Sequence, residues 1–155
     1  MIRVIFGKKK GIFSPVKGEF IPLEEVADPV FAQKMMGDGV AVIPSSDEIV
    51  SPVVGTVTTI IEQKHALGLT MEGGQEVLVH MGIDTVELNG APFEVYVKTG
   101  DHVEIGTPLA KMDRATVKVA GKDTVIMVII TGQQLNSHKL TKRTSVNQGD
   151  ELGKL

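Results

Sequence analysis

Short strand-like runs separated by glycine, proline, aspartate and asparagine dominate this 155-residue chain. Most have five to seven residues and are rich in Val, Ile and Thr, which is typical of β-strands. The runs are Gly39–Pro44, Glu48–Pro52, Thr56–Ile61, Ala66–Met71, Glu76–Met81, Phe93–Val97, Pro108–Met112 and Thr124–Ile130. Their regular spacing predicts an all-β protein, an antiparallel β-sandwich or barrel. Val125–Ile130 is apolar throughout and is expected to be buried on both faces.

Helical signals are scarce. Asp28 followed by Pro29 is a typical helix start, because aspartate caps free backbone N–H groups and proline suits the first helical position. Gly37 ends this segment after two turns at most, and a second short turn is expected after Gly132. The predicted β-fold therefore carries one or two short helical turns.

Composition narrows the functional classes. With 42% hydrophobic and 23% charged residues, the chain is ordinary for a globular protein, which excludes disorder of the whole chain. A net charge of −3 argues against a nucleic-acid-binding surface. The absence of cysteine excludes disulfides, thiolate metal sites and cysteine nucleophiles. No run approaches the ~18 apolar residues that a membrane span needs.

The N-terminal end differs in charge from the remainder. Three lysines, Lys8–Lys10, follow the partly apolar Met1–Phe6, which is the reverse of the order in a secretory signal. We therefore expect a cytoplasmic protein with a short basic N-terminal segment over residues 1–11 and a single β domain over residues 12–155. Whether the first residues contact a membrane surface or simply fray is left open.

A short internal repeat suggests a duplicated unit. Ser14–Gly18 reads SPVKG, and Ser51–Gly55, 37 positions later, reads SPVVG. Two related strand–turn–strand units would explain this, and so would chance recurrence of a common turn. Gly100–Leu109 has a turn–valine–turn–leucine spacing that resembles barrel-sandwich hybrid domains such as biotinyl and lipoyl carriers. Lys111 is not flanked by methionines on both sides, so a swinging-arm function is not expected.

A Gly-Gly pair at Gly73 and Gly74 separates two strand-like runs and predicts a tight hairpin, because such turns need positive φ angles. If these two residues form the loop, His80 lies opposite Leu67, and His65 lies on the same face two residues away. The histidines then become diagonal neighbours with Cβ atoms about 7–8 Å apart. A four-residue loop keeps this register, whereas an odd-numbered loop places the histidines on opposite faces.

A histidine pair on one sheet face has three interpretations. The two side chains can be polar residues that the surface tolerates. They can be ligands of a zinc site, with Asp84 as a candidate third ligand. They can also serve phosphoryl transfer, in which one imidazole nitrogen attacks phosphorus and the other ring donates an N–H to the charged oxygens.

The segment Leu78–Leu88, which reads LVHMGIDTVEL, closely resembles the phosphorylation-site signature of one protein family. This family is the enzyme IIA component of the bacterial sugar phosphotransferase system, glucose/glucoside class. Other stretches resemble further standard segments of the family, including the one with its second active-site histidine: Lys64–Ala66, Asp28–Phe31 and Met36–Ala41. The likeness extends from about Ile12 to about Gly132.

This resemblance implies a β-sandwich of the duplicated hybrid motif type and the function of a phosphocarrier. Nε2 of His80 would accept a phosphoryl group from the phosphocarrier protein HPr and pass it to a cysteine on a IIB domain of a sugar permease. His65 would hydrogen-bond the phosphoryl oxygens without being modified. Asp28 and Asp84 would form the rim of the site and contact basic residues of HPr. The apolar docking surface would consist of Val30, Phe31, Met35, Met36, Ile61, Leu78 and Val86.

The sequence departs from the family pattern at two places. Gln63 stands where many members have a threonine that helps to set the hydrogen bonds of the second histidine. Gln134 stands where some members have a further acidic residue at the rim. His102 and His138 lie outside the motif and are assigned to the surface.

A second functional class stays open beside the phosphocarrier. The same face could belong to a regulatory binding module that acts on permeases or metabolic enzymes, with phosphorylation of His80 as its switch. A zinc peptidase of the related hybrid fold would need an additional His-x-His pair, which the four histidines do not form. The resemblance implies no cofactor and no resident metal, although His65 and His80 could ligate zinc in a partner complex.

Overall fold

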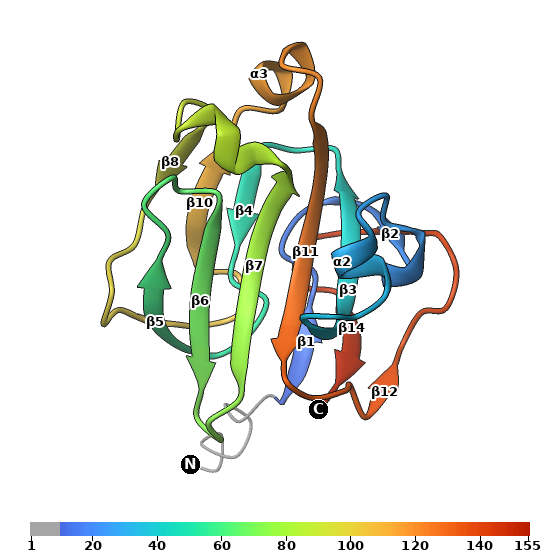
Figure 1. Ribbon diagram of the computed structural model, residues 1–155. Coiled ribbons are helices and arrows are strands. Elements are labelled where there is room, and N and C mark those ends of the chain that lie inside the picture. The colour runs from blue at the N-terminus through green and yellow to red at the C-terminus, as the bar shows by residue number, and fades with distance from the viewer. Residues whose placement is uncertain (1–9) are drawn as a thin grey trace.

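The computed structural model describes residues 10–155 and arranges most of them in antiparallel β-sheets (Figure 1). Eight strands form the large sheet, in the spatial order β13 (Thr144–Val146), β2 (Gly18–Ile21), β3 (Gly37–Pro44), β11 (Asp123–Thr131), β7 (Glu76–Ile83), β6 (Ala66–Met71), β5 (Gly55–Ile60) and β9 (His102–Val103). Two three-stranded sheets pack beside it. One is β1 (Gly11–Phe13), β14 (Glu151–Lys154) and β12 (Ser137–His138); the other is β4 (Glu48–Val50), β10 (Pro108–Met112) and β8 (Phe93–Val95).

The predicted all-β antiparallel fold is confirmed, since every strand pairing among the described residues is antiparallel. The proposed basic segment over residues 1–11 lies, apart from its last two positions, outside the described residues. No helix within residues 10–155 is long and apolar enough to cross a bilayer.

Strand β11 is buried on both faces, as its apolar sequence predicts. Val128 and Ile130 belong to the main core, which lies between the large sheet and the two small ones. Met127 and Ile129 belong to a second apolar cluster on the opposite face. The segment before β3 covers this second face (Figure 1). It contains the 3₁₀ turn η1 (Leu23–Glu25) and the helix α2 (Pro29–Ala32).

The helical segments only partly match the prediction. The carboxylate of Asp28 caps α2 by accepting a hydrogen bond from the Val30 N–H at 2.9 Å, as expected from the sequence. The turn predicted after Gly132 is wrong, because the backbone N–H of Leu135 binds the carboxylate of Asp38 and that of Asn136 binds a carbonyl of β14. Three further segments were not predicted: the 3₁₀ turns η1 and η2 (Thr85–Leu88) and the helix α3 (Arg114–Val119).

The internal repeat is a structural duplication. The buried hydroxyl of Ser14 donates to the carbonyl of Val16 at 2.7 Å, and that of Ser51 donates to the carbonyl of Val53 at 2.7 Å. The backbone hydrogen bonds between the copies are reciprocal: Phe13 N–H to the Pro52 carbonyl at 2.9 Å, and Val50 N–H to the Pro15 carbonyl at 2.8 Å. Matching internal and mutual hydrogen bonds favour two related units over chance recurrence.

Candidate active site

His80 lies on the outer face of β7, the face that carries the second apolar cluster. It pairs with Ala66 of β6 on one side and with Met127 of β11 on the other. Alternation along β7 sends Val79 and Met81 into the main core, so His80 points the other way. The small side chain of Ala66 leaves room for the imidazole, which is half-buried.

One ring nitrogen of His80 is held by its own chain. Nδ1 lies 2.8 Å from the carbonyl oxygen of Gly82. Because a carbonyl can only accept, Nδ1 carries the hydrogen in the neutral ring, and Nε2 keeps its lone pair. Gly82 has a φ of +81°, and a Cβ there would lie 2.5 Å from a side-chain carbon of Thr85. Glycine therefore permits the left-handed backbone within β7 that aims this carbonyl at the ring.

The hairpin between β6 and β7 has a register different from the predicted one. The Met71 N–H donates to the Gln75 carbonyl at 2.9 Å, so that a three-residue loop separates these residues. Of the two glycines only Gly74 has a positive φ, +93°, which is incompatible with the expected two-residue turn. His80 consequently lies opposite Ala66 and not opposite Leu67.

Strand alternation with this odd loop would put the two histidines on opposite faces, yet their rings are close. The ring centroids of His65 and His80 are 5.2 Å apart, and the ring planes meet at 82°. His65 precedes β6 and follows Lys64, whose left-handed backbone has a φ of +64°. A turn closed by the Lys64 N–H and the Ile61 carbonyl redirects the chain there. The predicted proximity is confirmed, but the local turn produces it, not the strand register.

The His65 ring is buried and incompletely paired. Its side chain is 8% exposed, and Nδ1 has no hydrogen-bond partner among the described residues. The side-chain amide of Gln63 therefore makes no hydrogen bond to this nitrogen. Burial lowers the pKa of His65, so the ring is neutral at pH 7 and carries one N–H that can be donated.

An apolar side chain packs against the His80 ring, and burial lowers the pKa of this ring. The Phe31 ring lies against the imidazole, with 4.9 Å between centroids and 56° between planes. Burial, together with the neighbouring His65, lowers the pKa of His80 to about 4, although the Gly82 carbonyl and the carboxylates of Asp28 and Asp84 oppose this. At neutral pH the ring is thus uncharged and its Nε2 lone pair is available as a nucleophile.

Two predicted rim carboxylates lie near the histidine pair. Asp28 is half-buried and Asp84 is exposed, and both line a cleft of about 420 Å³ together with Lys122. The ammonium group of Lys122 is paired with Glu87 at 2.8 Å. Since Lys122 is already paired, Asp28 and Asp84 leave negative charge beside His80 for a cationic partner group.

The predicted docking residues divide into exposed and supporting ones. The exposed side chains are Val30, Met35, Met36 and Val86. The buried or half-buried ones are Phe31, Ile61 and Leu78. Exposed apolar side chains beside a candidate nucleophile are typical of a protein-binding surface. Docking at this surface stays a prediction.

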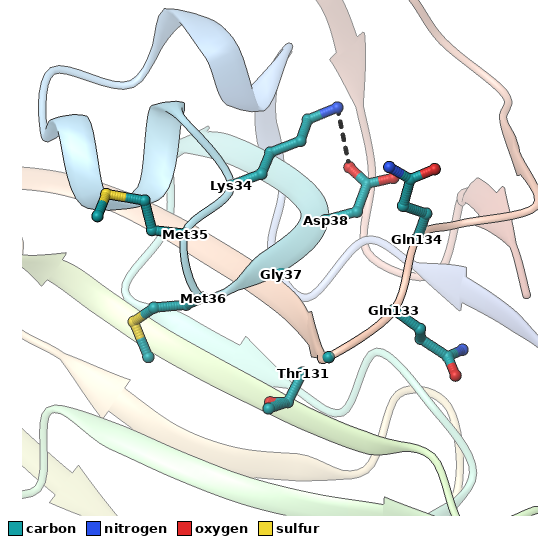
Figure 2. Close-up of a pocket in the computed structure, with 9 residues that line it drawn as sticks. Lys34, Met35, Met36, Gly37, Asp38, Thr131, Gln133 and Gln134 are labelled. Carbon is teal, nitrogen blue, oxygen red and sulfur yellow. Dashed lines mark ion pairs between the residues drawn. The ribbon is translucent and has the colours of Figure 1, made fainter.

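A second cavity of about 520 Å³ borders this surface, and Figure 2 shows its lining residues, among them Lys34, Asp38 and Gln134. The Asp38 side chain is 4% exposed and pairs with Lys34 at 3.3 Å and with His138 at 3.1 Å. Burial alone would raise the pKa of Asp38, but hydrogen bonds from the Leu135 N–H and from His138 keep it below its usual value.

Sequence reasoning missed the role of Asp38, which joins the loop after α2 to the segment before β12. The assignment of His138 to the surface is wrong in part, because its ring is half-buried and paired with that carboxylate. His102 is exposed, as predicted, and Gln134 is also exposed. Within residues 10–155 no group of three His, Asp and Glu side chains is placed to hold a metal ion.

Comparisons with known proteins place this fold and site in a family. A family model described as phosphoenolpyruvate-dependent sugar phosphotransferase system, EIIA 1, matches residues 10–136. The solved structure of glucose permease IIA from Mycoplasma capricolum superimposes with a TM-score of 0.81 at 34% identity, covering 96% of each chain. The chain belongs to the EIIA 1 family of the sugar phosphotransferase system, and this family has a phosphocarrier role.

Curated relatives agree with this assignment. The chain is 40% identical over 157 residues to a PTS system glucose-specific EIIA component of Staphylococcus aureus (strain COL), covering 97% of this chain and 95% of that protein. It is 48% identical over 136 residues to a glucose-specific EIICBA component of Streptococcus pneumoniae serotype 4. That match covers 87% of this chain and 19% of the longer protein.

Proposed function

We propose that this protein accepts a phosphoryl group from phospho-HPr on Nε2 of His80 and passes it to a cysteine on a IIB domain of a sugar permease. The observation that carries the proposal is the 2.8 Å hydrogen bond from Nδ1 of His80 to the Gly82 carbonyl. It leaves Nε2 as the unprotonated nitrogen of a ring whose neighbour, His65, can donate an N–H. Both transfers take place in the cytoplasm.

In the first step the Nε2 lone pair attacks phosphorus, and the bond from phosphorus to the donor's leaving group breaks. The new N–P bond makes the His80 ring cationic, because Nδ1 retains its hydrogen. The Gly82 carbonyl and the carboxylates of Asp28 and Asp84 stabilise this cation, as they do the protonated ring. In the second step a cysteine sulfur attacks phosphorus, the N–P bond breaks, and the ring returns to its neutral form.

His65 supports the transfer without becoming modified. Its ring lies edge-on to His80, 5.2 Å between centroids, so that its N–H can reach an oxygen of a phosphoryl group on Nε2. The Phe31 ring, which contacts the imidazole of His80, limits access of water to the N–P bond. The pair therefore combines a nucleophile with a neutral hydrogen-bond donor.

Partner proteins bind over the histidine pair. Asp28 and Asp84 attract basic residues of HPr, and the exposed side chains of Val30, Met35 and Val86 supply apolar contact. Several relatives are named glucose-specific, which makes a glucose permease the first acceptor to test.

The decisive experiment combines the protein with phosphoenolpyruvate, enzyme I and HPr, followed by mass spectrometry at neutral and acidic pH. We expect an acid-labile phosphate on the peptide that contains His80, and its loss when a IIB domain is added. His80→Gln should accept no phosphate, whereas the matched variant of an exposed histidine, His102→Gln, should behave as the native protein. Normal labelling of His80→Gln would overturn the assignment.

A regulatory binding module is the second candidate, because the same exposed apolar side chains could bind a permease or a metabolic enzyme. Phosphate on His80 would add about two negative charges to this surface and repel acidic partners. The acceptor step separates the two functions. A module that only regulates keeps its phosphate when the IIB domain is added, and a phosphocarrier loses it.

A further inference from the structure

Two methionines in the loop after α2 differ sharply from the others in exposure. Met35 is 69% exposed and Met36 is 40% exposed. The other methionines that the structure describes are buried: Met71, Met81, Met112 and Met127. Figure 2 shows the side chains of Met35 and Met36 extending away from the ion pair between Lys34 and Asp38. Small oxidants in water can therefore reach these two sulfur atoms far more readily than the buried ones.

The loop that carries them is tied to the candidate nucleophile. The Met35 N–H donates to the Val30 carbonyl at 3.1 Å, which fixes the loop against α2. The next residue of α2, Phe31, contacts the His80 ring with 4.9 Å between centroids. Met35 is thus hydrogen-bonded to the neighbour of a side chain that touches the site.

The strand register gives the approximate distance of Met36 from the site. Met36 precedes Gly37, which pairs with Thr131 of β11, four residues along that strand from the partner of His80. Four residues along one strand and two strand spacings across the sheet put Gly37 about 16 Å from His80, and Met36 is the residue just beyond it. A typical interface covers about 800 Å² on each partner, which is a disc of about 16 Å radius. The edge of an interface centred on His80 therefore falls at the loop that carries the two methionines.

We propose that Met35 and Met36 form an oxidation-sensitive edge of the docking surface, where conversion to methionine sulfoxide by hydrogen peroxide weakens the binding of phospho-HPr. In this step a sulfur lone pair attacks one peroxide oxygen, an S–O bond forms, the O–O bond breaks and water leaves. The sulfur loses two electrons, which the peroxide gains. The functional half of this inference rests on the proposed phosphocarrier role.

The effect follows from the change in polarity. A thioether is apolar and flexible and suits a docking contact, whereas a sulfoxide is polar and disrupts such contacts. Covering its oxygen without a donor costs enough free energy to weaken docking about tenfold or more. The sulfur atoms lie outside the core and outside the histidine pair, so the fold and the nucleophile stay intact. Methionine sulfoxide reductases reverse the change.

The test treats the folded protein with hydrogen peroxide and follows two readouts. Peptide mass spectrometry should find oxygen added to the Met35–Met36 peptide well before the peptides of Met71, Met112 and Met127. Initial rates of phosphate transfer from phospho-HPr should show kcat/KM reduced about tenfold, with kcat unchanged at saturating phospho-HPr. Both readouts should return to their starting values after treatment with methionine sulfoxide reductases.

Variants separate this proposal from damage elsewhere. In the double variant Met35→Leu, Met36→Leu, kcat/KM should be the same before and after peroxide treatment. In Met112→Leu, peroxide should lower kcat/KM as much as it does in the native protein. Met35→Gln, Met36→Gln should imitate the oxidised state without peroxide. Equal oxidation of the buried methionines, or equal loss in the double leucine variant, would overturn the proposal. Failure of the untreated protein to accept phosphate would instead overturn the proposed function, and with it the docking half of this inference.

Discussion

Nδ1 of His80 donates a hydrogen bond to the carbonyl of Gly82, two residues further along the chain, at a distance of 2.8 Å. This contact selects the tautomer of the ring with local chain geometry alone. It depends on a left-handed backbone at Gly82, with a φ of +81°. The nitrogen that keeps its lone pair is therefore set by a glycine and not by a neighbouring acidic side chain.

Gly82→Ala should impair both stability and phosphate acceptance. An alanine Cβ would lie 2.5 Å from a side-chain carbon of Thr85 and 2.8 Å from the Asp123 carbonyl, in addition to the cost of a positive φ. We expect a loss of about 1–3 kcal/mol in the free energy of unfolding, measured in urea, and at least about tenfold slower phosphorylation of His80.

Gly74→Ala is the matched control for this variant. Gly74 also has a positive φ, +93°, but no atom lies within 4 Å of the added Cβ. It should cost about 1 kcal/mol and leave the rate of phosphorylation unchanged. Equal loss of rate in both variants would mean that the backbone at Gly82 has no specific role in phosphorylation.

His65→Gln should separate the two transfer steps. His80 keeps its tautomer and should still accept phosphate, but the support that the second imidazole gives to the phosphoryl oxygens changes. We expect transfer to the IIB cysteine to be about 100-fold slower in rapid-quench measurements. Unchanged onward transfer would show that His65 only packs against its neighbour.

The free energy of unfolding should fall as the pH is lowered from about 6.5 to 4. In the folded protein burial lowers the pKa of His80 from 6.5 to about 4, so the unfolded chain takes up a proton first. The contribution of His80 is present above pH 6.5 and is lost towards pH 4, at most roughly 3 kcal/mol.

Urea denaturation of the native protein and His80→Gln between pH 4.5 and 7 checks this prediction. The variant should show a smaller slope, and a residual slope of the same sign is expected from His65, whose pKa is also lowered by burial. Asp38 affects the free energy of unfolding only at lower pH. Its pKa in the folded protein lies below 3.8, so its contribution is lost as the pH falls through that range. Identical slopes in both proteins would contradict the burial of a neutral imidazole.

Ser14→Ala and Ser51→Ala should cost similar amounts of stability. Each removes a buried hydroxyl that donates to a carbonyl two residues later at 2.7 Å, which leaves that carbonyl unpaired. We expect about 1–2 kcal/mol for each in thermal or urea unfolding. Ser145→Ala, at an exposed position of β13, should lie within about 0.5 kcal/mol of the native protein. A large difference between the stability losses of Ser14→Ala and Ser51→Ala would show that the two copies of the repeat do not contribute equally.

Local patterns explain why much of this protein was predictable. Alternating and continuous apolar runs predict strands because side-chain direction alternates with a period of two, and Val125–Ile130 is buried on both faces as its composition indicates. The Asp28 cap depends only on neighbouring residues, and so does the segment around His80 that resembles the family signature. These features need no information about distant parts of the chain.

The tertiary structure decided the features that depend on turns and distant partners. Loop length between Met71 and Gln75 set a register that two glycines alone did not specify. The carboxylate of Asp38 became a buried junction because Leu135 and His138, about 100 positions later, return to it.

The sequence by itself determined the β-rich fold, the two histidines of the candidate site and the family, because each can be recognised from residue types and short spacings. Only the folded chain determined how His65 reaches His80. A left-handed turn at Lys64 redirects the backbone before β6, and such a turn depends on packing that no local pattern encodes.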